Sequence, residues 1–181
     1  NALIRVYNLG SVSVGGSTIS GINNGSDVGQ NASFYKGLYG WGGGDVPSKA
    51  MIDLMNDSHD PRLRVMFQPG DSTKGKYIGL DPTQNQTLQQ NTYNAAKVSR
   101  YNYSTLTYNL NLPGILIDAS EVNFLLSEYY LNAGSNGQAK ASYENGIRQS
   151  IAYYYWLRAN SSDNTEGAVT PPTATEINNY L

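Results

Sequence analysis

The stretch IDASEVNFLLSEYYLNAGSNGQAKASYENGIRQSIAYYYWLRAN, residues 117–160, decides the fold, because it predicts two helices joined by a short turn. Asp118 suits the N-cap of the first helix, since its carboxylate can accept hydrogen bonds from free N–H groups of the first turn. Glu121 stands where a capping-box glutamate reaches back to the cap residue. Gly134 suits the left-handed residue that ends many helices. A connection this short makes the two helices antiparallel neighbours.

Each of the two helices carries a stripe of apolar or small residues. In the first helix the three- and four-residue spacing places these residues on one face: Val122, Leu125, Leu126, Tyr129 and Ala133. The second helix should begin near Gln138, and its stripe is Ala139, Tyr143, Gly146, Ile147, Ser150, Ile151 and Tyr154. A glycine inside a helix costs about 1 kcal/mol relative to alanine. We expect close approach of the first helix at Gly146 to compensate. These features alone fit a helical hairpin in any α-rich domain.

The same residues resemble the paired helices of the SusD/RagB-like outer-membrane nutrient-binding lipoproteins. The positions that carry the resemblance are Glu121, Phe124, Leu125, Glu128, Gly134, Ala141, Tyr143, Gly146, Ile147, Ser150 and Ile151. Upstream, SKAMIDLMNDSHDPRLRVMF (residues 48–67) resembles the family's short helix followed by Asp-Pro-Arg-Leu. Downstream, ATEINNYL (residues 174–181) resembles the helix that follows the pair. These three blocks stand in the family's order across most of the chain.

The resemblance implies a tetratricopeptide-like fold that is mostly α, with long loops and a small β-hairpin. It also implies that residues 1–181 form a single domain, the C-terminal part of a longer SusD-like protein. Within it we expect a loop-rich part (1–45), a part with a short helix, a hairpin and loops (46–116), and a helical hairpin with a final helix (117–181).

Local patterns predict the smaller elements between these blocks. A long loop is expected over residues 10–33. A helix is expected with Pro47 in its first turn and Ser48 close by, running to about Asn56, with Met51, Leu54 and Met55 on its apolar face. The β-hairpin is expected to pair residues 63–67 with residues 76–80. We expect residues 81–99 to be a loop, and residues 101–111 to be a strand or an extended loop.

Composition excludes several classes of function. Only 14% of the residues are charged and the formal net charge is −2, which argues against a nucleic-acid partner, because phosphate neutralisation needs a basic surface. The absence of cysteine rules out disulfides and thiolate metal sites within this sequence. The sequence has no apolar run of about 18 residues, as a membrane span would need. It does not begin with Met and shows no signal peptide, so we expect a piece of a mature protein.

The sequence gives little support to catalysis. Its single histidine, His59, stands at a predicted helix end, where a solvated or capping role is commoner than that of a base. There is no nucleophile elbow and no phosphate-binding loop. Glu121 and Glu128 could suggest glycoside hydrolysis, but two helical turns separate their backbones by roughly 10 Å. We therefore expect a protein that is not an enzyme, with no cofactor and no metal site.

The main candidate for a ligand site is the segment FYKGLYGWGGG (residues 34–44), whose aromatic residues are spaced by glycines. Sugar rings stack on exposed aromatic faces and need amide or carboxylate partners for their hydroxyls. Trp41 is flanked by glycines and stands close to Tyr39 and Asp45. Tyr35 is a second aromatic candidate, and Tyr101, with Tyr103, a third. The alternative is that Trp41 packs on the core, as a single tryptophan commonly does.

The resemblance implies a surface-exposed lipoprotein of the bacterial outer membrane. Such a protein binds a glycan or a peptide and delivers it to a SusC-like TonB-dependent transporter, and its lipid anchor would lie outside this chain. A structural or adhesive surface domain without a small-ligand site is the alternative. An exposed, concave cluster around Trp41 would favour the first function, and a buried Trp41 on a flat surface the second.

Overall fold

The computed structural model describes residues 12–14, 17–19, 46–109, 111–112, 115 and 117–181. Its elements are, in chain order, β1 (Val12–Val14), β2 (Ser17–Ile19), α3 (Lys49–Asp57), α4 (Leu63–Met66), β3 (Phe67–Gln68), α5 (Gln86–Asn94), β4 (Arg100–Tyr101), the π-helix η2 (Tyr103–Thr107), α6 (Ala119–Asn132), α7 (Asn136–Ala159) and α8 (Ala174–Tyr180). The described chain is mostly helical with small antiparallel sheets, which confirms the predicted fold class.

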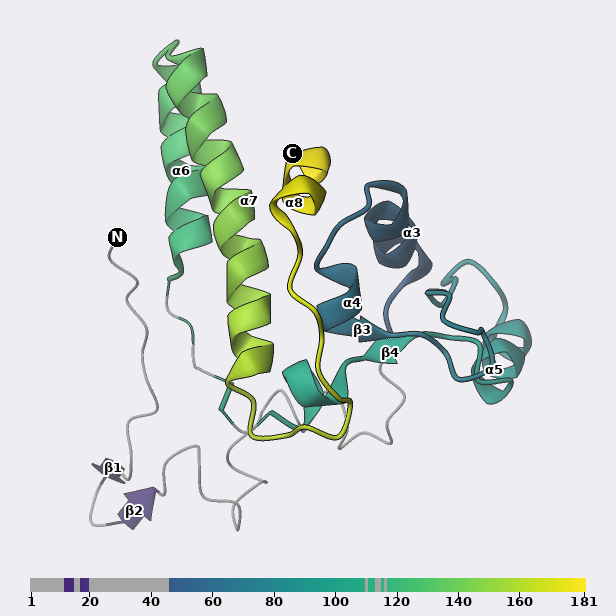
Figure 1. Ribbon diagram of the computed structural model, residues 1–181. Coiled ribbons are helices and arrows are strands. Elements are labelled where there is room, and N and C mark those ends of the chain that lie inside the picture. Colours follow the sequence, from purple (N-terminus) through teal and green to yellow (C-terminus); the bar gives the residue numbers. More distant parts are fainter. Residues whose placement is uncertain (1–11, 15–16, 20–45, 110, 113–114, 116) are drawn as a thin grey trace.

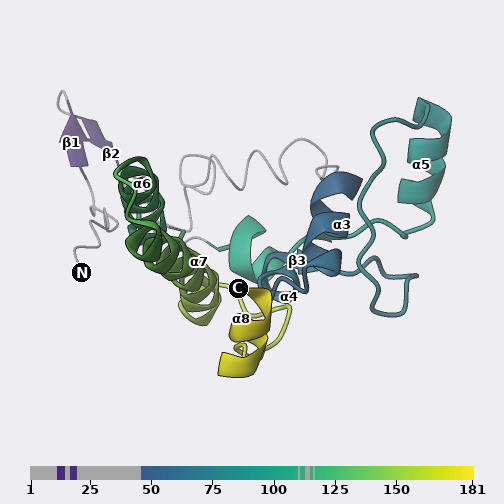
Figure 2. The same ribbon diagram turned by 90° about the horizontal axis from the view of Figure 1, so that it is seen from above.

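The predicted helical hairpin is α6 and α7, which stand antiparallel and side by side (Figures 1 and 2). The Asp118 carboxylate caps α6 by accepting the Glu121 N–H at 2.7 Å, as predicted. Gly134 follows α6 with a φ of 73°. Because this left-handed residue turns the chain, the N–H groups of residues 134 and 135 reach back to the carbonyls of residues 131 and 130 in a Schellman motif.

The two helices of the hairpin approach closely at Gly146, which confirms the compensation expected there. A Cβ at this position would lie 2.6 Å from Cε1 of Phe124. One turn further along α6, the Ser127 hydroxyl donates to the Ala139 carbonyl at 2.8 Å. The face of α6 that meets α7 is thus lined by a ring and a hydroxyl. The helix α7 begins at Asn136, two residues before the expected start.

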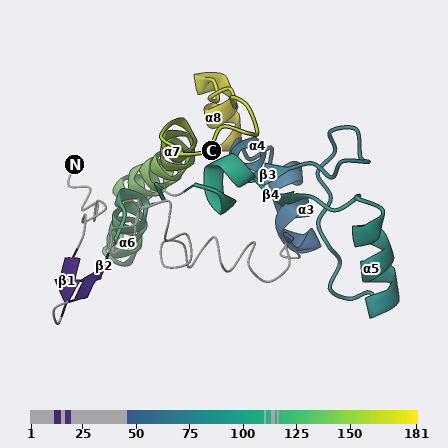
Figure 3. The same ribbon diagram turned by 90° about the horizontal axis from the view of Figure 1, so that it is seen from below.

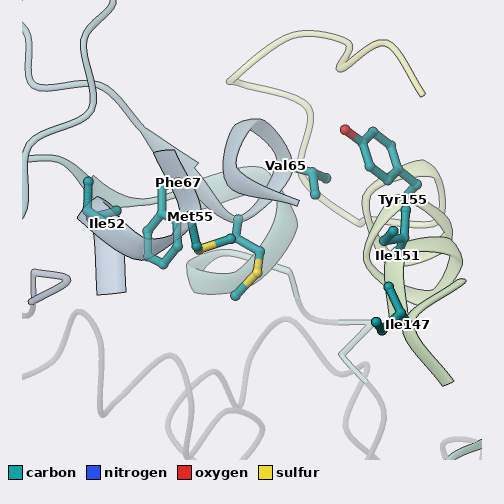
Figure 4. Packing of buried hydrophobic residues seen from close by; sticks show 8 residues of the cluster. Ile52, Met55, Val65, Phe67, Ile147, Ile151 and Tyr155 are labelled. Atoms are coloured by element: carbon teal, nitrogen blue, oxygen red, sulfur yellow. The ribbon is translucent and has the colours of Figure 1, made fainter. Parts of the chain in front are cut away.

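The core lies where the C-terminal half of α7 meets the segment from α3 to β3. It is made of Ile52, Met55, Val65, Met66, Phe67, Ile147, Ile151 and Tyr155. Figure 4 shows Val65 between the side chains from α3 and β3 and those from α7. On α3 the core residues are Ile52 and Met55, while Leu54, expected on the apolar face, is 69% exposed. Figure 3 shows α8 close to α4 and α7, whereas α5 lies at the far end from the helix pair.

The predicted pairing of residues 63–67 with residues 76–80 is wrong. Leu63–Met66 is the one-turn helix α4, and β3 pairs instead with β4, in the register Phe67↔Tyr101. The segment around Ile78 and Leu80 joins two other segments: Ile78 exchanges hydrogen bonds with Ser99, and Leu80 forms a bridge with Ser48. The partner of β3 is distant in sequence, so local alternation could not identify it.

Three further segments differ from prediction. The helix α5 lies inside the expected loop 81–99, with the Asn85 side chain accepting the Leu88 N–H at 2.9 Å. Its sequence, QTLQQNTYN, is mostly polar, so no apolar period reveals the helix. The expected strand or extended loop 101–111 is extended only at its start, because the Asn102 side chain caps η2. The expected loop 10–33 contains β1 and β2.

Candidate functional site

The structure tests only part of the predicted aromatic site. Trp41, Tyr39, Tyr35 and Asp45 lie outside the described residues. Tyr101 is described: it is half-buried, it ends β4, and its ring centroid lies 5.2 Å from that of Phe67. One side of the Tyr101 ring therefore borders the core.

Tyr101 is one of several neighbouring aromatic and charged residues on β4 and η2, which together form a short surface. The guanidinium of Arg100 lies 4.1 Å from the centroid of the Tyr103 ring, within the range of a cation–π contact. Tyr103 in turn lies 4.6 Å from Tyr108, centroid to centroid. Arg100 also forms an ion pair with Glu166 at 2.9 Å. Sequence reasoning named Tyr103 but missed Arg100 and Glu166, which stand 66 residues apart and carry no shared local signal.

A buried polar segment holds this surface in place. The residues from Ser104 to Thr107 are all buried within η2, and Asp163 from the loop after α7 accepts the Ser104 hydroxyl at 2.5 Å. Burial opposes ionisation of Asp163, but hydrogen bonds from Ser104 and Thr165 prevail and lower its pKa. Two buried side-chain atoms, Nδ2 of Asn102 and Oγ1 of Thr105, have no hydrogen-bond partner in the structure. Unpaired buried polar atoms are uncommon, and π-helical turns are frequent at functional sites.

A second feature is the ion pair between Asp60 and Arg62 in the Asp-Pro-Arg block, which we call the charged hub because other segments bind to it. The Asp60 carboxylate is 3% exposed and accepts hydrogen bonds from Nε and Nη2 of Arg62. The same guanidinium donates to the Ser150 hydroxyl and to the Tyr180 hydroxyl, both at 2.8 Å. The block therefore ties α7 and α8 to the turn before α4. These partners stand 88 and 118 residues from Arg62. The sequence therefore revealed the Asp-Pro-Arg block but not the residues that it contacts.

A pocket of about 380 Å³ lies beside this hub. Its lining is Met51, Leu54, Met55, Ser58, Asp60, Arg62, Met66, Ser150, Tyr154 and Tyr180. The volume is within the range of small-ligand sites. However, the Arg62–Asp60 pair is already occupied with internal hydrogen bonds, and the remaining lining is rich in methionine. The pocket can accept an apolar group, but its charged groups serve the fold.

Within the described residues, no group of three or more His, Asp or Glu side chains could hold a metal ion. His59 is exposed and has a φ of 55° at the end of α3, where its N–H donates to the Asn56 carbonyl. It therefore serves as a helix-ending residue, as expected. No helix in the described part of the chain has both the length and the apolarity of a membrane span.

Comparison with known proteins defines the class and then the family. A solved structure titled "chitin-binding protein" is 22% identical, with a TM-score of 0.61; the alignment covers 81% of this chain and 31% of that one. A SusD homolog from Bacteroides fragilis NCTC 9343 is 23% identical, with a TM-score of 0.58, covering 74% of this chain and 30% of that one. At these identities the likeness concerns the fold, which is the helical SusD-like fold.

A family model for SusD-like proteins, described as "Starch-binding associating with outer membrane", matches residues 28–180. This chain therefore belongs to the SusD-like family, which confirms the resemblance carried by the helix pair. Members of this family are binding proteins rather than enzymes. The chain spans less than a third of the length of the two solved structures. A search of curated proteins finds no match.

Proposed function

We propose that this chain is the C-terminal part of a longer surface lipoprotein that binds a glycan without chemically changing it. The longer protein would deliver the glycan to a SusC-like TonB-dependent transporter in the outer membrane. The observation that carries the proposal is the SusD-like family match over residues 28–180. The structural likeness to a protein titled chitin-binding supports a glycan rather than a peptide as the first ligand to test.

We propose that the ligand meets the aromatic residues predicted from sequence, Trp41, Tyr39, Tyr35 and Tyr101, with Asp45 accepting from sugar hydroxyls. One described feature supports Tyr101 as one edge of this site. Arg100 directly precedes Tyr101, Tyr103 stands two residues after it, and the two are in cation–π contact, so a cation and a second ring lie beside Tyr101.

Calorimetric titration of the protein with chitin oligosaccharides and with malto-oligosaccharides tests the proposal. Truncating an aromatic anchor at a binding site costs about 2 kcal/mol or more, so Trp41→Ala should weaken binding by at least about tenfold. Tyr93→Ala is the matched control, because this ring is 39% exposed on α5 and is not among the proposed site residues. Its affinity should equal that of the wild type.

Two results would contradict the proposal at different points. Equal binding by the wild type and Trp41→Ala would remove Trp41 from the site while leaving the glycan function intact. If neither this chain nor the longer protein bound either sugar, the alternative of a structural or adhesive surface domain would replace the glycan function.

A further inference from the structure

The pocket beside the charged hub has an apolar floor and an apolar mouth. Among the residues that line it, Met55 and Met66 are buried and belong to the core, so they form the floor. Met51 and Leu54 are exposed and border the solvent at the mouth. Methionine side chains are flexible and polarisable, and they adapt to the shape of an apolar group. The floor of the pocket therefore suits a small apolar group such as a methyl.

Two residues of α7 bring hydroxyl groups to the same pocket. Ser150 and Tyr154 stand one turn apart on one face of the helix, and both line the cavity. The Ser150 hydroxyl accepts from Arg62 at 2.8 Å, but it donates no hydrogen bond to a described residue. The Tyr154 hydroxyl forms no hydrogen bond within the described part of the chain, and burial raises its pKa, so it keeps its proton. Two neighbouring donors favour a ligand with an acceptor oxygen.

The remaining polar groups of the pocket favour an uncharged ligand. The carboxylate of Asp60 and the guanidinium of Arg62 neutralise one another, so the ion pair leaves no net charge. Ser58 also lines the pocket, and its hydroxyl donates to the Leu54 carbonyl at 2.7 Å. A hydroxyl oxygen that donates its proton keeps its lone pairs, so Ser58 can accept from an N–H group. An apolar floor, two donors and one acceptor together match the methyl, the carbonyl oxygen and the N–H of an acetamide.

We propose that this pocket binds the acetamido group of an N-acetylated sugar. The two methionines of the floor contact its methyl group, the hydroxyls of Ser150 and Tyr154 donate to its carbonyl oxygen, and the hydroxyl of Ser58 accepts from its N–H. The sugar ring lies toward the mouth of the pocket. The inference rests on the proposed function for the choice of a glycan. It adds a second subsite, separate from the aromatic residues around Trp41, and it names the class of sugar.

NMR titration of the longer protein with N-acetylglucosamine and with glucose tests the inference, because the two sugars differ only in the group at C2. N-acetylglucosamine should bind at least about tenfold more tightly, with the strongest saturation transfer at its methyl protons. Tyr154→Phe removes one donor but keeps the ring that packs against the core, and it should weaken this binding about fivefold. Tyr143→Phe is the matched control, because it removes a hydroxyl from an exposed ring of α7 outside the pocket, and it should leave the affinity unchanged.

The outcomes separate this inference from the proposed function. Equal affinity for the two sugars, or no binding of N-acetylglucosamine, would overturn the acetamido assignment. Equal binding of N-acetylglucosamine by the wild type and Tyr154→Phe would remove it from this pocket. In Trp41→Ala, saturation transfer to the acetamido methyl should persist, while binding of malto-oligosaccharides, which have no acetamido group, should weaken. Malto-oligosaccharide binding that is unchanged in Trp41→Ala would contradict the proposed aromatic site and leave the pocket assignment standing.

Discussion

The ring of Phe124 lies in the space that any side chain at position 146 would need. A Cβ on Gly146 would lie 2.6 Å from Cε1 and 2.8 Å from Cδ1 of that ring. The Phe124 ring also contacts Tyr143, with centroids 5.8 Å apart, so it is held between two turns of α7. This relationship explains why a residue with poor helix propensity stands in the middle of a 24-residue helix.

We predict that Gly146→Ala destabilises the protein by about 1 kcal/mol. Overpacking against Phe124 costs about 1–3 kcal/mol, and the gain in helix propensity returns about 1 kcal/mol. In a Phe124→Ala background the same substitution should be stabilising, because the obstructing ring is gone. Urea unfolding of the four proteins in this cycle measures the effect. Gly137→Ala is the control, since a Cβ there meets nothing within 4 Å. A destabilisation that is unchanged by Phe124→Ala would contradict the packing argument.

Arg62→Ala should cost about 3 kcal/mol in the free energy of unfolding. The substitution leaves the buried Asp60 carboxylate without its counter-ion, and breaking a buried pair in this way typically costs about 3–5 kcal/mol. We take the lower end because the Arg62 side chain keeps 21% exposure. Arg62→Lys should recover only part of the loss, since an ammonium cannot reproduce the forked contact. Arg148→Ala, which removes an exposed bond to Asn178, is the control and should change stability by less than about 0.5 kcal/mol.

The attachment of α8 should weaken as the pH falls from about 4.5 to about 2. A hydrogen bond from Arg64 and the capping-box bonds of Thr173 lower the pKa of Glu176 from 4.5 to about 2. A lowered folded pKa contributes stability that is complete above pH 4.5 and is lost as the pH falls through 2. Hydrogen exchange of the α8 amides should show stronger protection at pH 4 than at pH 2. In Glu176→Gln, protection should no longer change between these values; a persisting change would assign the acid sensitivity to another carboxylate.

Tyr155 should make the protein sensitive to alkali. Burial raises the pKa of the Tyr155 hydroxyl from 10.0 to about 12, although Arg64 acts in the opposite direction. The protonated hydroxyl donates to the Pro61 carbonyl at 2.7 Å. A raised folded pKa contributes stability that is present below pH 10 and lost as the pH rises through 12. Tyr155→Phe should cost about 1 kcal/mol at neutral pH through the lost hydrogen bond. Its stability should fall less steeply than that of the wild type between pH 10 and 12, as measured by urea unfolding.

Local signals were sufficient for the helix pair and, within two residues, for α3. Asp118 and Gly134 bound α6 as predicted, and α3 begins at Lys49, two residues after Pro47, which was expected in its first turn. Local signals failed for β3 and β4, because a two-residue strand contains too few residues for a recognisable alternation. They failed for α5 as well, since its sequence, QTLQQNTYN, is mostly polar and shows no apolar period.

In the candidate site, too, the sequence identified single residues, whereas their contacts needed the tertiary structure. Tyr101 could be singled out from composition and its neighbours, but its contact with Phe67 depends on the pairing of β3 with β4. The Arg100–Glu166 ion pair joins positions on either side of the helix pair. The predictions for Trp41, Tyr39, Tyr35 and Asp45 stay predictions, because these residues lie outside the described chain.

The sequence by itself determined the helix pair, the Asp118 cap and Gly134 ending of α6, and the close contact at Gly146, because these depend on residues close together in the sequence. It also determined the family, through three blocks that stand in the family's order. Only the tertiary structure decided which side of α6 meets α7. The choice depends on shape: the cleft beside Gly146 accepts the Phe124 ring, and Ser127 finds the Ala139 carbonyl. The periodic stripe of Val122, Leu125, Leu126 and Tyr129 therefore stays exposed in the described structure. Periodicity identifies an apolar face, but only three-dimensional packing determines what covers it.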